Sequence, residues 1–223
     1  HDWLVKYQAS QPETKCQEVF DQYFADPDWA QLYTLVGIED TAFEDSADYA
    51  AYMEEKVGDT ELICMETSAG LSGDHKYVIR LGEEKIATFL LTPEEEGEDR
   101  ITTWDLGPME LFFQRQGSVT VEKSAGETVY INGVALSEDY TVKKTSTLAE
   151  SYLPEGLHGF QRQMQTVTGL LTDPVVTVKD AAGNDVAVTM NENGIYETAV
   201  APMEISDSEY NAAVSAAKAY ALY

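Results

Sequence analysis

Basic residues are scarce in this sequence. Its 223 residues include 14 Lys and Arg against 40 Asp and Glu, which gives a formal net charge of −26. Nucleic acids and anionic membrane surfaces are bound chiefly through Lys and Arg side chains. We therefore expect the protein to bind neither nucleic acid nor an anionic membrane surface directly.

Long apolar runs are also absent, since none approaches the roughly 20 residues that cross a bilayer. The sequence contains no recognisable signal peptide. Hydrophobic residues nevertheless make up 43% of the chain, more than a disordered acidic segment carries. The chain is therefore expected to fold, and its length predicts one or two globular domains. Because the chain opens at His1 without a Met, we expect it to be a processed or trimmed piece of a longer protein.

Cysteine is limited to two residues, Cys16 and Cys64. Two are too few for a disulfide-rich scaffold, and their spacing matches neither a zinc ribbon nor a CxxC redox site. Cys16 falls on the apolar face of the first expected helix and Cys64 in the first expected strand, so helix-on-sheet packing would bring them together. They form either one disulfide bond or two buried free thiols.

Signatures of catalysis and of metal binding are missing. The three histidines have no partner at ligand spacing, and we interpret them as residues of solvated loops or the terminus. The acidic run at 94–99 lacks the alternation of a calcium-binding loop, and the segment 70–74 has Asp74 where a nucleophile elbow needs Gly. The sequence contains no glycine-rich phosphate-binding motif. We predict no catalytic residue, no metal site and no cofactor.

Helical periodicity dominates the first sixty residues. From Pro12, apolar residues recur at helical spacing on one face, with polar residues opposite. Asp26 is the expected N-cap of a second helix that ends at Gly37, and Ser46 is the expected N-cap of a third that ends at Gly58.

After Gly58 the apolar period changes from 3.6 to 2, which is typical of strands. Strands are expected at 61–67, 76–81, 86–92 and 101–113, the last with a bulge or bend at Gly107-Pro108 because Pro cannot donate to a ladder. Helices followed by a β-meander predict an α+β domain over residues 1–115.

Short strands separated by Asn-Gly-type turns follow from residue 117. This pattern predicts a small antiparallel, sandwich-like β domain over 117–203. An apolar stripe at helical spacing then predicts a helix over 206–223, which we interpret as the start of a further domain.

The order of elements over residues 12–114 resembles the nuclear transport factor 2-like (cystatin-like cone) fold, and is similar to membrane-proximal domains of Gram-positive cell-envelope proteins. The run 126–134, which ends in Asn132-Gly133-Val134, resembles the hairpin of PEGA-like and teicoplanin-resistance-associated β domains. The resemblance implies an extracytoplasmic protein held at the cell surface through an anchor outside this chain. It also implies that 206–223 opens a second cone-like domain.

Aromatic residues are concentrated in the first domain, where a cone-like sheet would enclose a cavity. They either fill the core or line a ligand site. The candidate ligand-binding residues are Trp29, Tyr33, Tyr52, Trp104 and Asp105.

Taken together, these features predict a non-catalytic extracytoplasmic spacer or binding module of a larger, membrane-anchored bacterial envelope protein. Its expected partner is a cell-wall component, a protein or a small apolar ligand. The alternative is a cavity enzyme of the isomerase or lyase type, or a protein that binds a small hydrophobic ligand in the cone.

Overall fold

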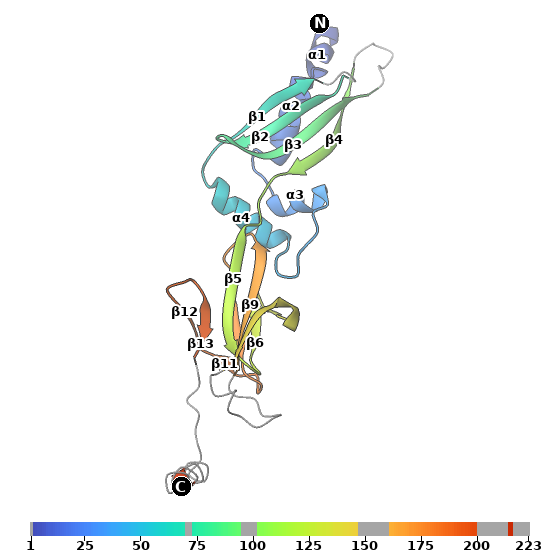
Figure 1. The fold of residues 1–223 in the computed structure, drawn as a ribbon. Helices are drawn as coiled ribbons and strands as arrows, with labels where there is room; N and C mark the ends of the chain where they lie inside the picture. The colour runs from blue at the N-terminus through green and yellow to red at the C-terminus, as the bar shows by residue number, and fades with distance from the viewer. Residues whose placement is uncertain (1, 70–72, 95–101, 147–160, 200–213, 216–223) are drawn as a thin grey trace. The chain divides into compact units, whose positions relative to one another are not determined.

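The structure is a computed structural model that describes residues 2–69, 73–94, 102–146, 161–199 and 214–215 (Figure 1). Its described part is a mixed α+β fold with four α-helices and mostly antiparallel strands. Two compact units make up the chain. The first comprises His1–Val119, Tyr130–Tyr140 and Thr166–Val176; the second comprises Thr120–Val129, Thr141–Gln165 and Thr177–Tyr223. The domain boundary expected at residues 115–117 stays a prediction.

The three predicted helices are present, and an unpredicted fourth precedes them. The helices are α1 (Asp2–Ala9), α2 (Pro12–Tyr23), α3 (Trp29–Val36) and α4 (Ser46–Val57). Helix α1 escaped prediction: among its described side chains, the large apolar residues Trp3, Val5 and Tyr7 are 55%, 59% and 47% exposed and form no buried stripe. The predicted helix over 206–223 lies outside the described residues, except for the helical pair 214–215.

Both N-caps that we expected for the second and third helices are wrong. Helix α3 is capped by Asp28, whose Oδ1 accepts a hydrogen bond from the Gln31 backbone N–H at 2.9 Å. Helix α4 is capped by Asp45, which forms a capping box with Asp48, so Ser46 is the first helical residue. In each case a carboxylate one or two residues from the expected cap satisfies the free N–H groups of the first turn.

The first unit contains a four-stranded antiparallel meander in the order β1-β2-β3-β4. These strands are β1 (Leu62–Ala69), β2 (His75–Leu81), β3 (Glu84–Pro93) and β4 (Trp104–Leu111). The predicted bulge is confirmed, because Phe89 pairs with Met109 and Leu91 with Leu106. Gly107 and Pro108 therefore stand together opposite a single residue of β3.

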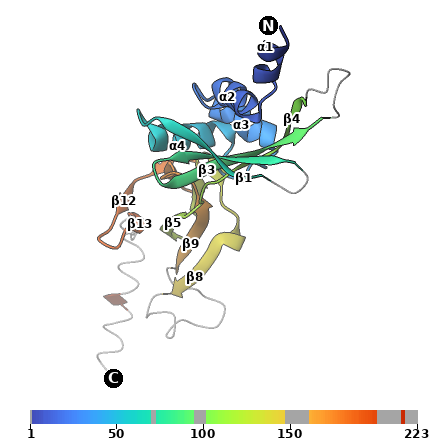
Figure 2. The same cartoon turned by 90° about the horizontal axis from the view of Figure 1, so that it is seen from above.

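Helices α2, α3 and α4 pack against one face of this meander (Figure 2). Aromatic rings form the centre of the contact. Phe89 stacks with Phe24 at a centroid distance of 6.5 Å and with Tyr77 at 5.3 Å. The ring centroids of Tyr49 and Tyr33 lie 5.1 Å apart. Stacked and tilted rings at these distances stabilise a core beyond the burial of their area.

The remaining strands form two further sheets, in the orders β11-β10-β6-β7 and β12-β13-β5-β9-β8. The strands are β5 (Gly117–Ser124), β6 (Thr128–Ile131), β7 (Val134–Ala135), β8 (Thr141–Ser146), β9 (Gln161–Leu170), β10 (Val176–Lys179), β11 (Asp185–Val186), β12 (Val188–Met190) and β13 (Tyr196–Thr198), with a short 3₁₀ helix, η1 (Glu138–Tyr140), before β8. Purely antiparallel pairing was expected here, and this is wrong for β13 and β5, which run parallel to each other.

The turn between β6 and β7 has type I′ geometry. Asn132 and Gly133 have φ angles of +49° and +82°, and Ile131 pairs with Val134. Positive φ at both central residues matches the twist of the flanking strands, and Asn-Gly is the pair that adopts it at least cost.

A close approach of two backbones at the start of β5 generates a first prediction. A Cβ atom added to Gly117 would lie 2.8 Å from the carbonyl oxygen of Leu170. We expect Gly117→Ala to lower the free energy of unfolding by about 1–3 kcal/mol, because one backbone must move away. Denaturant titration measures the loss, and Ser118→Ala, at an exposed neighbouring position, is the matched control. Equal stability of the two variants would contradict the close approach.

Candidate functional site

Two of the five candidate ligand-binding residues lie in the packed core. Trp29 and Tyr33 are only 3% and 1% exposed. The Tyr33 hydroxyl donates a hydrogen bond to the carbonyl oxygen of Glu39 at 2.7 Å. These two aromatic residues therefore fill the core, which is the alternative that the sequence left open.

Trp104 and Asp105 are neighbours at the start of β4, so their side chains point to opposite faces of the sheet. Trp104 packs partly buried against the core, and its Nε1–H donates to the carbonyl oxygen of Ser10 at 2.8 Å. Asp105 is exposed. The rings of Trp104 and His75 also contact each other edge-on, with their centroids 4.9 Å apart.

His75 departs from its interpretation as a solvated-loop residue. It opens β2, and its Nδ1 lies 2.6 Å from Oε1 of Glu66 on the neighbouring strand. It therefore takes part in a cross-strand polar pair. The other two histidines, His1 and His158, lie outside the described residues.

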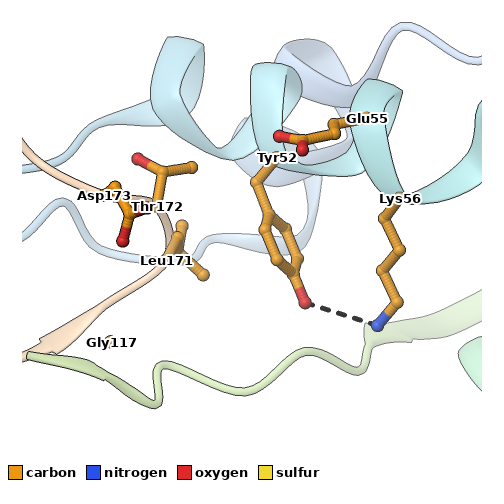
Figure 3. Close-up of a pocket in the computed structure, with 7 residues that line it drawn as sticks. All are labelled: Tyr52, Glu55, Lys56, Gly117, Leu171, Thr172 and Asp173. Atoms are coloured by element: carbon orange, nitrogen blue, oxygen red, sulfur yellow. Dashed lines mark hydrogen bonds between the residues drawn. The ribbon is translucent and has the colours of Figure 1, made fainter.

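The fifth candidate, Tyr52, lines a pocket of about 580 Å³ in the first unit (Figure 3). Three elements contribute to it: the last turns of α4, the start of β5 and the loop after β9. The lining residues are Tyr52, Glu55, Lys56, Gly117, Leu171, Thr172 and Asp173. Figure 3 shows Tyr52 and Lys56 extending from the helix, whereas residues 171–173 come from the loop. We take this pocket, named the α4 pocket below, as the candidate site.

Lys56 holds the phenol of Tyr52 in place. Its Nζ donates to the Tyr52 hydroxyl oxygen at 3.3 Å and to Oε1 of Glu84 at 2.6 Å. Burial acts to lower the pKa of Lys56, but the hydrogen bonds to Glu84 and Tyr52 outweigh it, so the pKa is raised. The ammonium group consequently stays charged at neutral pH and acts as a hydrogen-bond donor, not as a base.

The carboxylates of Glu55 and Asp173 complete the polar lining. Both side chains are exposed, and neither makes a hydrogen bond within the described part of the chain. The α4 pocket therefore presents an aromatic ring, an ammonium group, a hydroxyl and two carboxylates that accept no hydrogen bond from the described residues. Such a lining suits a small polar ligand that donates hydrogen bonds. This chemistry differs from that of the apolar ligand expected from the aromatic content.

One wall of the α4 pocket is held by the buried carboxylate of Glu44, which is 2% exposed. Its Oε1 accepts hydrogen bonds from the backbone N–H groups of Leu171 at 2.7 Å and Thr172 at 3.2 Å. Its Oε2 accepts from Nη1 of Arg115 at 2.6 Å. We call these four residues the Glu44 network. It satisfies the carboxylate on both oxygens, as a buried charge requires.

A second set of polar contacts also connects the loop before α4 to the segment between β9 and β10. The amide of Asn132 donates through Nδ2 to the carbonyl oxygen of Phe43 at 3.0 Å and accepts through Oδ1 from the Val175 N–H at 2.8 Å. Asn132 is thus both a turn residue and a bridge between the loop before α4 and the segment before β10.

Sequence reasoning missed Glu44 and Arg115. Glu44 lies in the acidic stretch 39–48, where one carboxylate does not stand out among its neighbours. The sequence did contain one signal for this pair. Basic residues are scarce, and Arg115 lies two residues after the apolar pair Phe112-Phe113, a position where a partly buried Arg needs an acidic partner.

No family model, curated protein or solved structure matches this chain. The resemblance to cone-like and PEGA-like domains therefore stays a prediction. Among the described residues, no helix combines the length and the apolar character that a bilayer crossing requires.

The Glu44 network generates the second prediction. We expect Glu44→Ala to lower the free energy of unfolding by about 3–5 kcal/mol, because it removes the carboxylate that pairs with the Arg115 guanidinium and leaves two backbone N–H groups without their acceptor. Chemical denaturation followed by circular dichroism measures this loss. Glu54→Ala on the exposed face of α4 is the matched control and should change stability by less than about 0.5 kcal/mol. A similarly small effect of Glu44→Ala would show that the network contributes little.

Proposed function

We propose that this chain is a non-catalytic spacer or binding module of a larger, membrane-anchored bacterial envelope protein, located outside the cytoplasm. The observation that carries the proposal is the Glu44 network. It uses a buried carboxylate and a guanidinium group to join segments 127 residues apart in the sequence. A spacer must keep its tertiary structure when its two ends are pulled apart. Charge-assisted hydrogen bonds in the interior resist separation of the segments that they join.

The core packing also favours a module over a cavity enzyme. Tyr33, a candidate ligand-binding residue, is 1% exposed, and Tyr49 beside it is fully buried. Asp105, the carboxylate among the candidates, is exposed on β4. A substrate that reached this carboxylate would not reach the hydroxyl groups of these two tyrosines.

The arrangement of elements supports the finer form of this proposal. Helices followed by a four-stranded meander are what a cone-like domain over 1–115 requires. The type I′ hairpin at Asn132-Gly133 is what the PEGA-like part, 117–203, requires. In this proposal the helix over 206–223 opens the next domain, and an anchor outside this chain holds the protein at the cell surface.

The α4 pocket is the binding element of the proposed module. Its polar lining and the acidic surface both favour a ligand with hydroxyl or amino groups, such as the amino sugars and peptide amines of a cell wall. Tyr52 would supply a face for the ring of a sugar, and Glu55 and Asp173 would accept its hydrogen bonds.

A third prediction tests binding at this pocket. Soluble saccharide–peptide fragments of bacterial cell wall are titrated into the protein by calorimetry. We expect the double variant Glu55→Gln/Asp173→Asn to raise Kd by about tenfold or more, because each lost charge-assisted hydrogen bond weakens binding. Glu54→Gln, one position away on α4, is the control and should bind like the unmodified protein. Absence of binding to the unmodified protein, or equal Kd values for all three, would contradict the proposal.

A fourth prediction tests location. In cells that express the full-length protein, a membrane-impermeant amine reagent should label Lys residues of this chain before lysis. A cytoplasmic enzyme labelled only after lysis serves as the control. If this chain is also labelled only after lysis, the extracytoplasmic location is wrong.

A further inference from the structure

The two cysteines meet across the contact between α2 and β1. Their Sγ atoms lie 3.0 Å apart, about 1 Å more than the length of a disulfide bond. Cys16 is 8% exposed, and Cys64, on the edge strand of the meander, is partly buried. The two sulfur atoms are therefore in direct contact and close to bonding distance.

The two thiols are not equivalent. Either sulfur atom can donate the hydrogen bond between them. This bond and burial raise the pKa of Cys16, whereas the same bond lowers the pKa of Cys64. Because the thiolate is the nucleophile, the lower pKa and greater exposure make Cys64 the more reactive sulfur. Cys16 is placed to attack any mixed disulfide that forms on Cys64.

Metal binding is a poorer use of this pair. A structural zinc site needs four ligands, usually Cys and His. Among the described residues, no group of three His, Cys, Asp or Glu side chains is arranged to hold a metal ion. Two sulfur atoms in direct contact, with no third ligand, fit a disulfide.

We infer that Cys64 and Cys16 form a dithiol–disulfide site, in which Cys64 is the attacking thiol and Cys16 the resolving one, and that the resulting bond fastens the edge strand β1 to α2. The oxidant is a low-molecular-weight disulfide such as oxidised glutathione. The inference concerns the chemistry of the pair and does not depend on the location proposed above.

The reaction proceeds in two exchanges. The Cys64 thiolate attacks one sulfur of oxidised glutathione, which forms a Cys64–glutathione disulfide and releases one glutathione thiolate. Cys16 then loses its proton and attacks Sγ of Cys64, which forms the Cys16–Cys64 bond and expels the second glutathione thiolate. Two protein thiols are oxidised, one disulfide is reduced to two glutathione molecules, and the two protons end on these products.

The assigned order of attack is tested by intact-mass spectrometry of folded protein after incubation with oxidised glutathione. The unmodified protein should lose about 2 Da, which is the loss of two hydrogens, without retaining glutathione. Cys16→Ala should accumulate a stable glutathione adduct on Cys64. Cys64→Ala should react slowly until denaturant exposes Cys16. A persistent adduct on the unmodified protein, an unchanged mass, or faster modification of Cys64→Ala than of Cys16→Ala would overturn the inference.

The fastening role is tested on the unmodified protein, so that no variant needs to fold. We expect the oxidised form to melt about 5–15 °C above the form kept in reductant, because the bond closes a long loop and restricts the unfolded chain. The double variant Cys16→Ala/Cys64→Ala should melt at the same temperature in both conditions. Equal melting temperatures for oxidised and reduced unmodified protein would overturn the role of the bond as a fastening.

Discussion

The carboxylate of Glu44 is an anion almost completely removed from water. Transfer of such a charge into the interior costs several kcal/mol unless partners replace its hydration. Here the partners are the Arg115 guanidinium and the backbone N–H groups of Leu171 and Thr172. They follow Glu44 in the sequence by 71, 127 and 128 residues. The charge is therefore tolerated only when three distant segments meet, which makes the network a condition for the fold of the first unit.

The same network determines the geometry of the α4 pocket. Leu171 and Thr172 line the pocket and also donate to Glu44. On the helix side, Lys56 is held by Glu84 and in turn holds the Tyr52 hydroxyl. Residues that face a ligand are thus positioned by charged groups outside the pocket, as in binding sites that are formed before the ligand arrives.

Local chemistry made several elements predictable. The helix-to-strand change in apolar period, the bulge at Gly107-Pro108 and the type I′ turn at Asn132-Gly133 each depend on a few adjacent residues. Helix α1 was missed because Trp3, Val5 and Tyr7, the large apolar residues among its described side chains, form no buried stripe. Cap positions were missed because several carboxylates and hydroxyls compete near each helix start. The parallel pairing of β13 with β5 was missed because it joins strands more than seventy residues apart.

For the candidate site, the sequence alone determined the acidic charge, the class of fold and the presence of Tyr52 on an amphipathic helix. Only the tertiary structure decided that Trp29 and Tyr33 fill the core while Tyr52 lines a pocket. It alone decided that Glu44 is the buried one among the carboxylates of the described residues. The physical reason is that periodicity identifies which face of an element is apolar, whereas burial and partner choice depend on long-range contacts that no local pattern encodes.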